Sequence, residues 1–124
     1  MRFVPLIVVV ALLFATALQS EAVPQWFAHQ DKLHHVLGFG ALAVALHLAF
    51  PRLFVVEYVL ILLTSAIAIE LGQSLVPPRL PSMLDLFASG VGAALGLLCV
   101  EFLKRRAAPA DPRATARTTV NPHR

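Results

Sequence analysis

Apolar residues fall into four long stretches, and most polar residues gather in the short segments between them. The stretches cover about residues 3–19, 31–50, 53–73 and 83–103. An α-helix rises 1.5 Å per residue, so about 20 apolar residues cross a hydrocarbon layer of roughly 30 Å. Pro51 and the three prolines of the QSLVPPRLPS segment cannot continue a helix and mark two boundaries. The pattern therefore predicts four membrane-spanning helices, of which the first is slightly short.

Composition supports the same fold class. Of the 124 residues, 58% are hydrophobic and 14% are charged, whereas a soluble domain carries roughly 25% charged residues. Four helices use most of the length, which leaves no room for a soluble enzyme domain. We therefore expect an all-α, polytopic membrane domain over residues 1–106. The tail over residues 107–124 is rich in Pro, Ala, Thr and Arg and is expected to be disordered.

The positive residues predict the orientation. With the N-terminus in the cytoplasm, eight of the ten Lys and Arg residues lie on the inner side, and only Lys32 and Arg79 face outward. Both termini are therefore predicted to be cytoplasmic. The first stretch could instead be a signal peptide, because its basic start and the Ala15-Thr16-Ala17 triplet fit that pattern. Retention is favoured, since four spans let both termini lie on one side.

Charge and cysteine content narrow the classes of partner. The net charge is +3, but the positive residues concentrate beside the last apolar stretch and in the tail after it, which argues against a nucleic-acid partner. The single cysteine, Cys99, lies in an apolar stretch, so neither a disulfide framework nor a cysteine-based metal site is available. The sequence predicts membrane lipids as partners and no cofactor.

The predicted orientation places a set of polar residues at the outer ends of the second, third and fourth stretches. The set is Asp31, Lys32, His34, His35, Glu70, Gln73, Arg79, Ser82 and Asp85. An ionisable residue costs about 2.5–3.5 kcal/mol at the centre of a membrane helix, and usually has a partner or a function. Asp31 and His35 are spaced i,i+4, and Glu70 and Gln73 i,i+3, so each pair shares a helix face. We expect these faces to converge on one outward-facing pocket.

A stripe of small and polar residues runs along the fourth stretch. Asp85, Ser89, Gly92 and Gly96 recur at steps of four, three and four residues. Small side chains at such positions let two membrane helices approach closely. The stripe therefore predicts a tight helix contact.

Purely structural roles remain open for several of these residues. Ser82 and Asp85 have the spacing of a capping box, and Asp31 could likewise cap its own helix. Glu70 could form an ion pair with Arg79 or Lys32 that simply holds helix ends together.

In order and spacing, these residues resemble the VanZ-like family of small bacterial membrane proteins. The family pattern is Asp-Lys-x-x-His at the start of a helix, then Glu-x-x-Gln, then an Arg, then an Asp followed by Asn and Gly. The corresponding segments here are DKLHHVLGFGALA, IELGQSLVPPR and SMLDLFASGVGAALG, within residues 31–103. Ser89 stands where the family usually has Asn, so a hydroxyl hydrogen bond replaces the expected amide one.

The resemblance implies a multi-pass protein of the bacterial plasma membrane. The namesake of the family is linked to resistance to the glycopeptide teicoplanin, and no reaction is agreed for its relatives. The leading hypothesis is an envelope protein whose outer pocket binds a lipid headgroup or a peptidoglycan precursor. The expected binding residues are Asp31, Lys32, His35, Glu70, Gln73, Arg79 and Asp85. Lys32 and Arg79 would pair with a phosphate or carboxylate of the ligand.

The rival hypothesis is a membrane enzyme that acts on a lipid-linked substrate. His35 would be the general base or acid, oriented by Asp31, with Glu70 as a second acid or base. A proton-coupled carrier is less favoured, because the middle of the helices is apolar. Asp31, His35, Glu70 and Asp85 have the ligand types of a metal site. No paired-histidine motif supports that reading, so no metal site is predicted.

Overall fold

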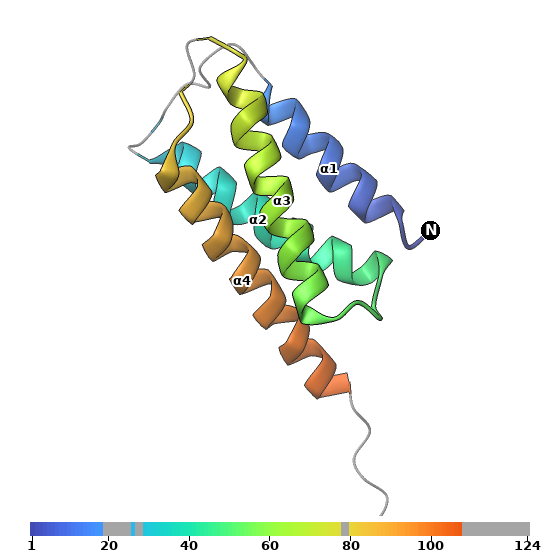
Figure 1. Cartoon of the computed structure of the whole chain (residues 1–124). Helices are drawn as coiled ribbons and strands as arrows, with labels where there is room; N and C mark the ends of the chain where they lie inside the picture. Colours follow the sequence, from blue (N-terminus) through green and yellow to red (C-terminus); the bar gives the residue numbers. More distant parts are fainter. Residues whose placement is uncertain (19–25, 27–28, 78–79, 108–124) are drawn as a thin grey trace, which may run out of the picture.

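The computed structural model describes residues 1–18, 26, 29–77 and 80–107, and the regular structure in these ranges is entirely helical. The helices are α1 (Val4–Ala17), α2 (Gln30–Ala49), α3 (Val55–Ser74) and α4 (Met83–Ala107). The chain runs back and forth, so that α1 and α3 end where α2 and α4 begin (Figure 1). We call that end the upper end, as it is drawn in Figure 1, and the opposite end the lower end. The all-α prediction is confirmed.

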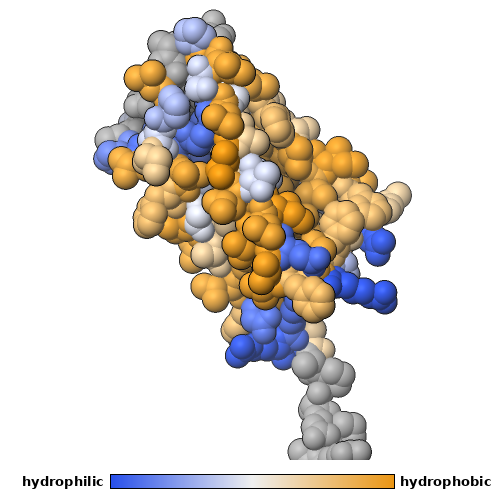
Figure 2. Space-filling model, viewed as in Figure 1, coloured by the Kyte–Doolittle hydropathy of each residue, from blue (hydrophilic) through white to orange (hydrophobic). Residues whose placement is uncertain are grey.

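Three helices, α2, α3 and α4, are long and apolar enough to cross a membrane. Large hydrophobic side chains point outward from them, among them Leu48, Leu60 and Leu98, which are each more than half exposed. Figure 2 shows hydrophobic residues over the flanks of the bundle and hydrophilic residues toward its two ends. In water such a surface would be a severe aggregation hazard, whereas in lipid it is the expected one. These helices indicate a multi-pass membrane protein.

The first helix is shorter than the sequence pattern predicts. α1 contains 14 residues, which corresponds to about 21 Å, less than the roughly 30 Å of a hydrocarbon layer. Pro5 lies in its first turn, where the missing N–H does no harm. The N–H of Leu18, the last apolar residue before Gln19, bonds to the carbonyl of Phe14 and closes the last turn. Residue 19 and the tail after Ala107 lie outside the described residues.

The tightest contact in the bundle joins α2 and α4, which run in the same direction. Gly92 lies against the backbone of Val36, and Gly96 lies against Gly40 and Ala43. A Cβ atom on Gly96 would be 2.5 Å from the carbonyl oxygen of Gly40, and one on Gly92 would overlap the carbonyl group of Val36. The predicted small-residue stripe therefore lies at a helix interface, and α2 is its partner.

A group of polar contacts joins α2 to α3 at the lower end. The hydroxyl of Tyr58, which is 3% exposed, donates to the carbonyl of Phe50 at 2.6 Å. Nδ1 of His47 lies 2.9 Å from the same hydroxyl oxygen. The Glu57 carboxylate accepts the backbone N–H of Phe54 at 2.7 Å, which caps the start of α3. These contacts fix the α2–α3 turn and place the start of α3 beside the end of α2.

Candidate functional site

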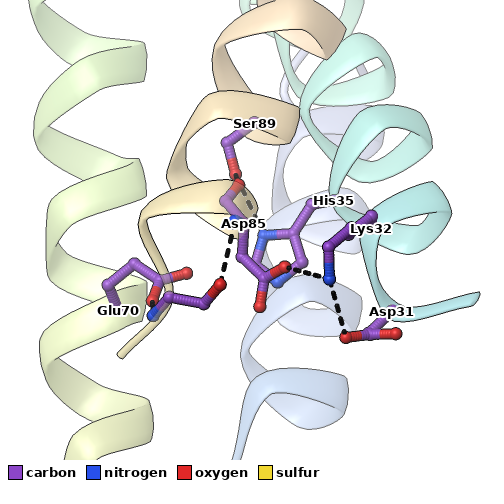
Figure 3. Close-up of polar contacts among 7 residues, drawn as sticks. Asp31, Lys32, His35, Glu70, Asp85 and Ser89 are labelled. Carbon is purple, nitrogen blue, oxygen red and sulfur yellow. Dashed lines mark hydrogen bonds and ion pairs between the residues drawn. The ribbon is translucent and has the colours of Figure 1, made fainter. Parts of the chain in front are cut away.

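A polar cluster lies at the upper end, where α2, α3 and α4 meet (Figure 3). We define the polar cluster by six residues: Asp31, Lys32 and His35 from α2, Glu70 from α3, and Asp85 and Ser89 from α4. Five of the seven binding residues expected from the sequence thus lie together. Gln73, also expected, is buried in the last turn of α3 and lines an adjoining groove. Arg79 lies outside the described residues.

Lys32 ties α2 to α4 through two carboxylates. Its Nζ atom lies 3.5 Å from Oδ2 of Asp31 and 3.5 Å from Oδ1 of Asp85. The Asp85 side chain is 15% exposed and the Lys32 side chain 28%, so water screens this pair less than it screens a surface pair. Among the described residues Lys32 forms no ion pair with Glu70, contrary to one of the alternatives drawn from the sequence. Its charge is largely engaged inside the protein.

The ring of His35 is held by Ser89 rather than by Asp31. Nδ1 of His35 lies 2.9 Å from Oγ of Ser89, and that hydroxyl donates its single proton to the carbonyl of Asp85 at 2.9 Å. When both bonds form, Nδ1 must be the donor toward Ser89. In the neutral imidazole this network assigns the free lone pair to Nε2. His35 therefore has one nitrogen available as a base or as a metal ligand.

Glu70 connects α3 to the start of α4. It is 8% exposed, and its Oε2 accepts the backbone N–H of Ser82 at 2.9 Å. Ser82 Oγ in turn accepts the backbone N–H of Asp85 at 3.4 Å. The capping box predicted between Ser82 and Asp85 is thus half formed, and Glu70 from another helix supplies the second half. This arrangement leaves the Asp85 carboxylate to face Lys32.

Two buried carboxylate oxygens of the site, Glu70 Oε1 and Asp85 Oδ1, have no hydrogen-bond partner among the described residues. Asp85 Oδ1 faces the Lys32 ammonium, whereas Glu70 Oε1 has no ion pair in this part of the chain. One ligand atom from each of His35, Glu70 and Asp85 lies within 4.8 Å of the other two. A buried carboxylate oxygen is costly unless a donor or a cation meets it. The geometry of these three residues suits a proton, a ligand hydrogen-bond donor or a cation.

A groove of about 720 Å³ adjoins the polar cluster and runs down between α1 and α2. Its apolar part is lined chiefly by Val9, Leu12, Leu13, Leu37, Phe39, Ile69 and Leu80. Its polar part is lined by Thr16, Gln30, Asp31, His34, His35, Gln73 and Asp85. These polar residues lie at the upper ends of their helices, and the apolar lining from α1 and α2 lies deeper. The groove is therefore amphipathic along its length.

Ser89, Thr16 and Gln30 contribute to the site or its groove but were not among the expected binding residues. Ser89 was identified as part of the small-residue stripe and at the position where the family usually has Asn, and its bond to His35 was not expected. The i,i+4 spacing of Asp85 and Ser89 was the available signal for Ser89, since it places both side chains on the α4 face that carries the glycines.

No family model, no curated protein and no solved structure matches the chain.

Proposed function

We propose that this protein binds an amphiphile of the cell envelope, either a lipid or a lipid-linked cell-wall precursor, in the groove between α1 and α2. The amphipathic lining of the groove is the observation that carries the proposal. A volume of about 720 Å³ lies within the usual range for small-ligand sites, roughly 300–1,000 Å³. The apolar chain of the ligand would contact Leu12 and Leu37, and its polar group would reach His35 and Asp85.

The charges of the polar cluster favour a headgroup that offers hydrogen-bond donors. Among the described residues the polar cluster holds three carboxylates, from Asp31, Glu70 and Asp85, and one lysine, which pairs with Asp31 and Asp85. Hydroxyl or amine groups of a sugar, an ethanolamine or a peptide would pair with carboxylate oxygens. The sequence-based hypothesis paired a phosphate or carboxylate of the ligand with Lys32 and Arg79. Lys32 is already paired with two carboxylates, so it is less available to such a ligand than that hypothesis supposed.

The VanZ-like resemblance supports this proposal and extends it. It implies a protein of the bacterial plasma membrane, and five of the six cluster residues belong to the family pattern: Asp31, Lys32, His35, Glu70 and Asp85. The resemblance also suggests a link to teicoplanin-type resistance, because the namesake of the family has such a link. The link to resistance is part of the proposal.

The proposal also includes four spans with both termini in the cytoplasm. Arg2, Arg52 and the basic end of α4 lie in lower-end segments, whereas Lys32 lies at the upper end, so the lower end is expected to face the cytoplasm. A reporter active only in the cytoplasm, fused after Arg106, should be active, and one inserted in the 75–77 segment should be silent. An inactive Arg106 fusion at normal abundance would reverse the orientation.

The binding function is tested by lipid retention. Protein purified in mild detergent should keep an envelope amphiphile that native mass spectrometry detects and identifies. Leu37→Trp places a large ring in the groove and should lower retention several-fold, because it occupies the space of the apolar chain. Leu48→Trp is the matched control, since Leu48 is an exposed residue of the same helix outside the groove. Equal retention by the two variants would contradict binding in the groove.

One observation favours a second candidate, an enzyme that acts on a lipid-linked substrate. His35 has an available Nε2, and a ligand atom of its ring lies within 4.8 Å of a carboxylate oxygen of Glu70, whose Oε1 has no hydrogen-bond partner among the described residues. This arrangement suits general acid–base chemistry. In this candidate Ser89 takes the orienting role that the sequence-based hypothesis gave to Asp31. If wild-type protein turns over the retained amphiphile and His35→Ala does not, the protein is an enzyme rather than a binding protein.

A further inference from the structure

We propose that His35, Glu70 and Asp85 form a binding site for one divalent transition-metal ion at the head of the groove. This inference rests on the proposed function and deepens it, because a bound cation would let the acidic cluster accept a phosphate-bearing headgroup. The residues come from α2, α3 and α4, and one ligand atom of each lies within 4.8 Å of the others.

The burial of the Glu70 carboxylate supports the metal site independently of the grouping of the three residues. This side chain is 8% exposed, and its Oε1 is buried without a hydrogen-bond partner in the part of the chain that the structure describes, while Oε2 accepts the Ser82 N–H. Figure 3 shows the Glu70 carboxyl group pointing toward Asp85. A buried carboxylate of this kind needs a compensating positive charge or a proton. Lys32 supplies its charge to Asp31 and Asp85, so Glu70 lacks a cation among the described residues.

The second shell of His35 matches what metal-bound histidines require. A ligating imidazole usually donates its other N–H to a hydrogen-bond acceptor, which fixes the tautomer and the ring orientation. Here the Nδ1–H donates to Ser89 Oγ, and Ser89 is itself held by the Asp85 carbonyl. Nε2 is then left free to bind an ion. Ser89 is a positioning residue in this arrangement.

Asp85 can serve both the ion and Lys32, because a carboxylate has two oxygens. Oδ1 faces Lys32, which leaves Oδ2 for the metal. Metal–ligand bonds to His and carboxylate are about 2.0–2.2 Å, so ligands on opposite sides of an ion lie about 4 Å apart. Small side-chain rotations from the present separation would close the site.

The donor set indicates the class of ion. One imidazole nitrogen with two carboxylate oxygens suits a first-row divalent ion such as Zn²⁺ or Mn²⁺ better than Ca²⁺ or Mg²⁺, which prefer oxygen alone. Three protein ligands leave at least one coordination position open, as in catalytic zinc sites. An open position beside the groove is where a phosphate oxygen of the ligand would bind.

The experiment measures metal content on the full chain, purified in detergent without a histidine tag. The protein is stripped with a chelator and dialysed against Zn²⁺, and in a second series against Mn²⁺. Wild type is expected to retain about one ion per chain, the stoichiometry of a single closed set of protein ligands. His35→Ala and Glu70→Gln should fall to background, whereas the controls His47→Gln and Glu57→Gln, both at the lower end, should bind as wild type does.

A further variant covers the case in which a ligand substitution prevents folding. Ser89→Ala keeps all three ligands and removes only the group that orients His35, so its metal affinity should fall by about 10–100-fold. Helical content and monodispersity are recorded for each variant. Wild type without metal above background, or His47→Gln losing as much as His35→Ala, would overturn the proposal.

Lipid retention, measured with and without chelator, separates the two proposals. If a phosphate-bearing amphiphile is released by chelator, both the metal site and its role in binding are supported. If wild type retains the amphiphile equally in chelator and binds no metal, the inference fails and the proposed function stands. If metal binds but no amphiphile is retained, the metal site stands and the proposed function fails.

Discussion

Gly92→Ala is expected to cause the largest loss of stability of any single-methyl change in this protein. The added Cβ would overlap the backbone carbonyl of Val36, with the carbonyl carbon only 2.8 Å away. Backbone cannot rotate aside as a side chain does, so α2 and α4 must separate. Overpacking typically costs about 1–3 kcal/mol, occasionally more, and we expect at least the upper end of that range. The measurement is the fraction of monodisperse protein that survives heating in detergent.

Gly90→Ala is the matched control for this prediction. Gly90 lies on the same helix two residues earlier, and a Cβ there would meet no atom within 4 Å. Alanine is the better helix former by about 1 kcal/mol, so this variant should match wild type or exceed it slightly. Equal losses in Gly90→Ala and Gly92→Ala would show that the α2–α4 contact is not the close one described.

Lys32→Met is expected to give the second large effect. Removing the ammonium leaves Asp31 and Asp85 without their shared partner, and Asp85 lies close to the Glu70 carboxylate. Losing one member of a partly buried pair is far more harmful than never having the pair, because the remaining charge is desolvated. Chelator-treated Lys32→Met should therefore show a midpoint of thermal unfolding lower by several degrees. Asp85→Leu should lower this midpoint less, because Lys32 remains paired with Asp31.

The double variant Lys32→Met/Asp85→Leu tests whether the pair is coupled. It should be more stable than the sum of the two single losses predicts, because neither charge is left alone on the α2–α4 interface. Arg105→Met is the control for simple charge removal. It breaks the Arg105–Glu101 pair, whose side chains are 79% and 54% exposed, and should change the midpoint little. Strict additivity in the double variant would contradict the coupling.

The helices could be predicted from the sequence because a chain in lipid has few ways to form the hydrogen bonds of its backbone. α2 and α3 begin and end within two residues of the expected stretches, and α4 runs four residues further, through its basic end. The apolar length and the flanking prolines carry that information. α1 ends two residues earlier than expected, since apolar length alone does not fix the last turn of a helix.

The site could be predicted as a set of residues but not as a set of bonds. Spacing along a helix shows which side chains share a face, and this was enough to group His35, Glu70 and Asp85 at one depth. The partner of each residue depends on how the helices rotate and cross. Ser89, and not Asp31, bonds to His35, and the backbone of Ser82, and not a cation, bonds to Glu70. Those contacts join separate helices, and no spacing within one helix encodes them.

The close α2–α4 packing at Gly92 and Gly96 divides the three proposed ligands into two classes. His35 and Asp85 belong to the two helices whose contact is most extensive, so their separation is set before any ligand arrives. Glu70 comes from α3, which contacts α4 less extensively. Two ligands are thus preorganised, and the entropic cost of binding falls mainly on the third. Substitutions along the α3–α4 contact, far from the polar cluster, should therefore tune affinity without changing which ligand is selected.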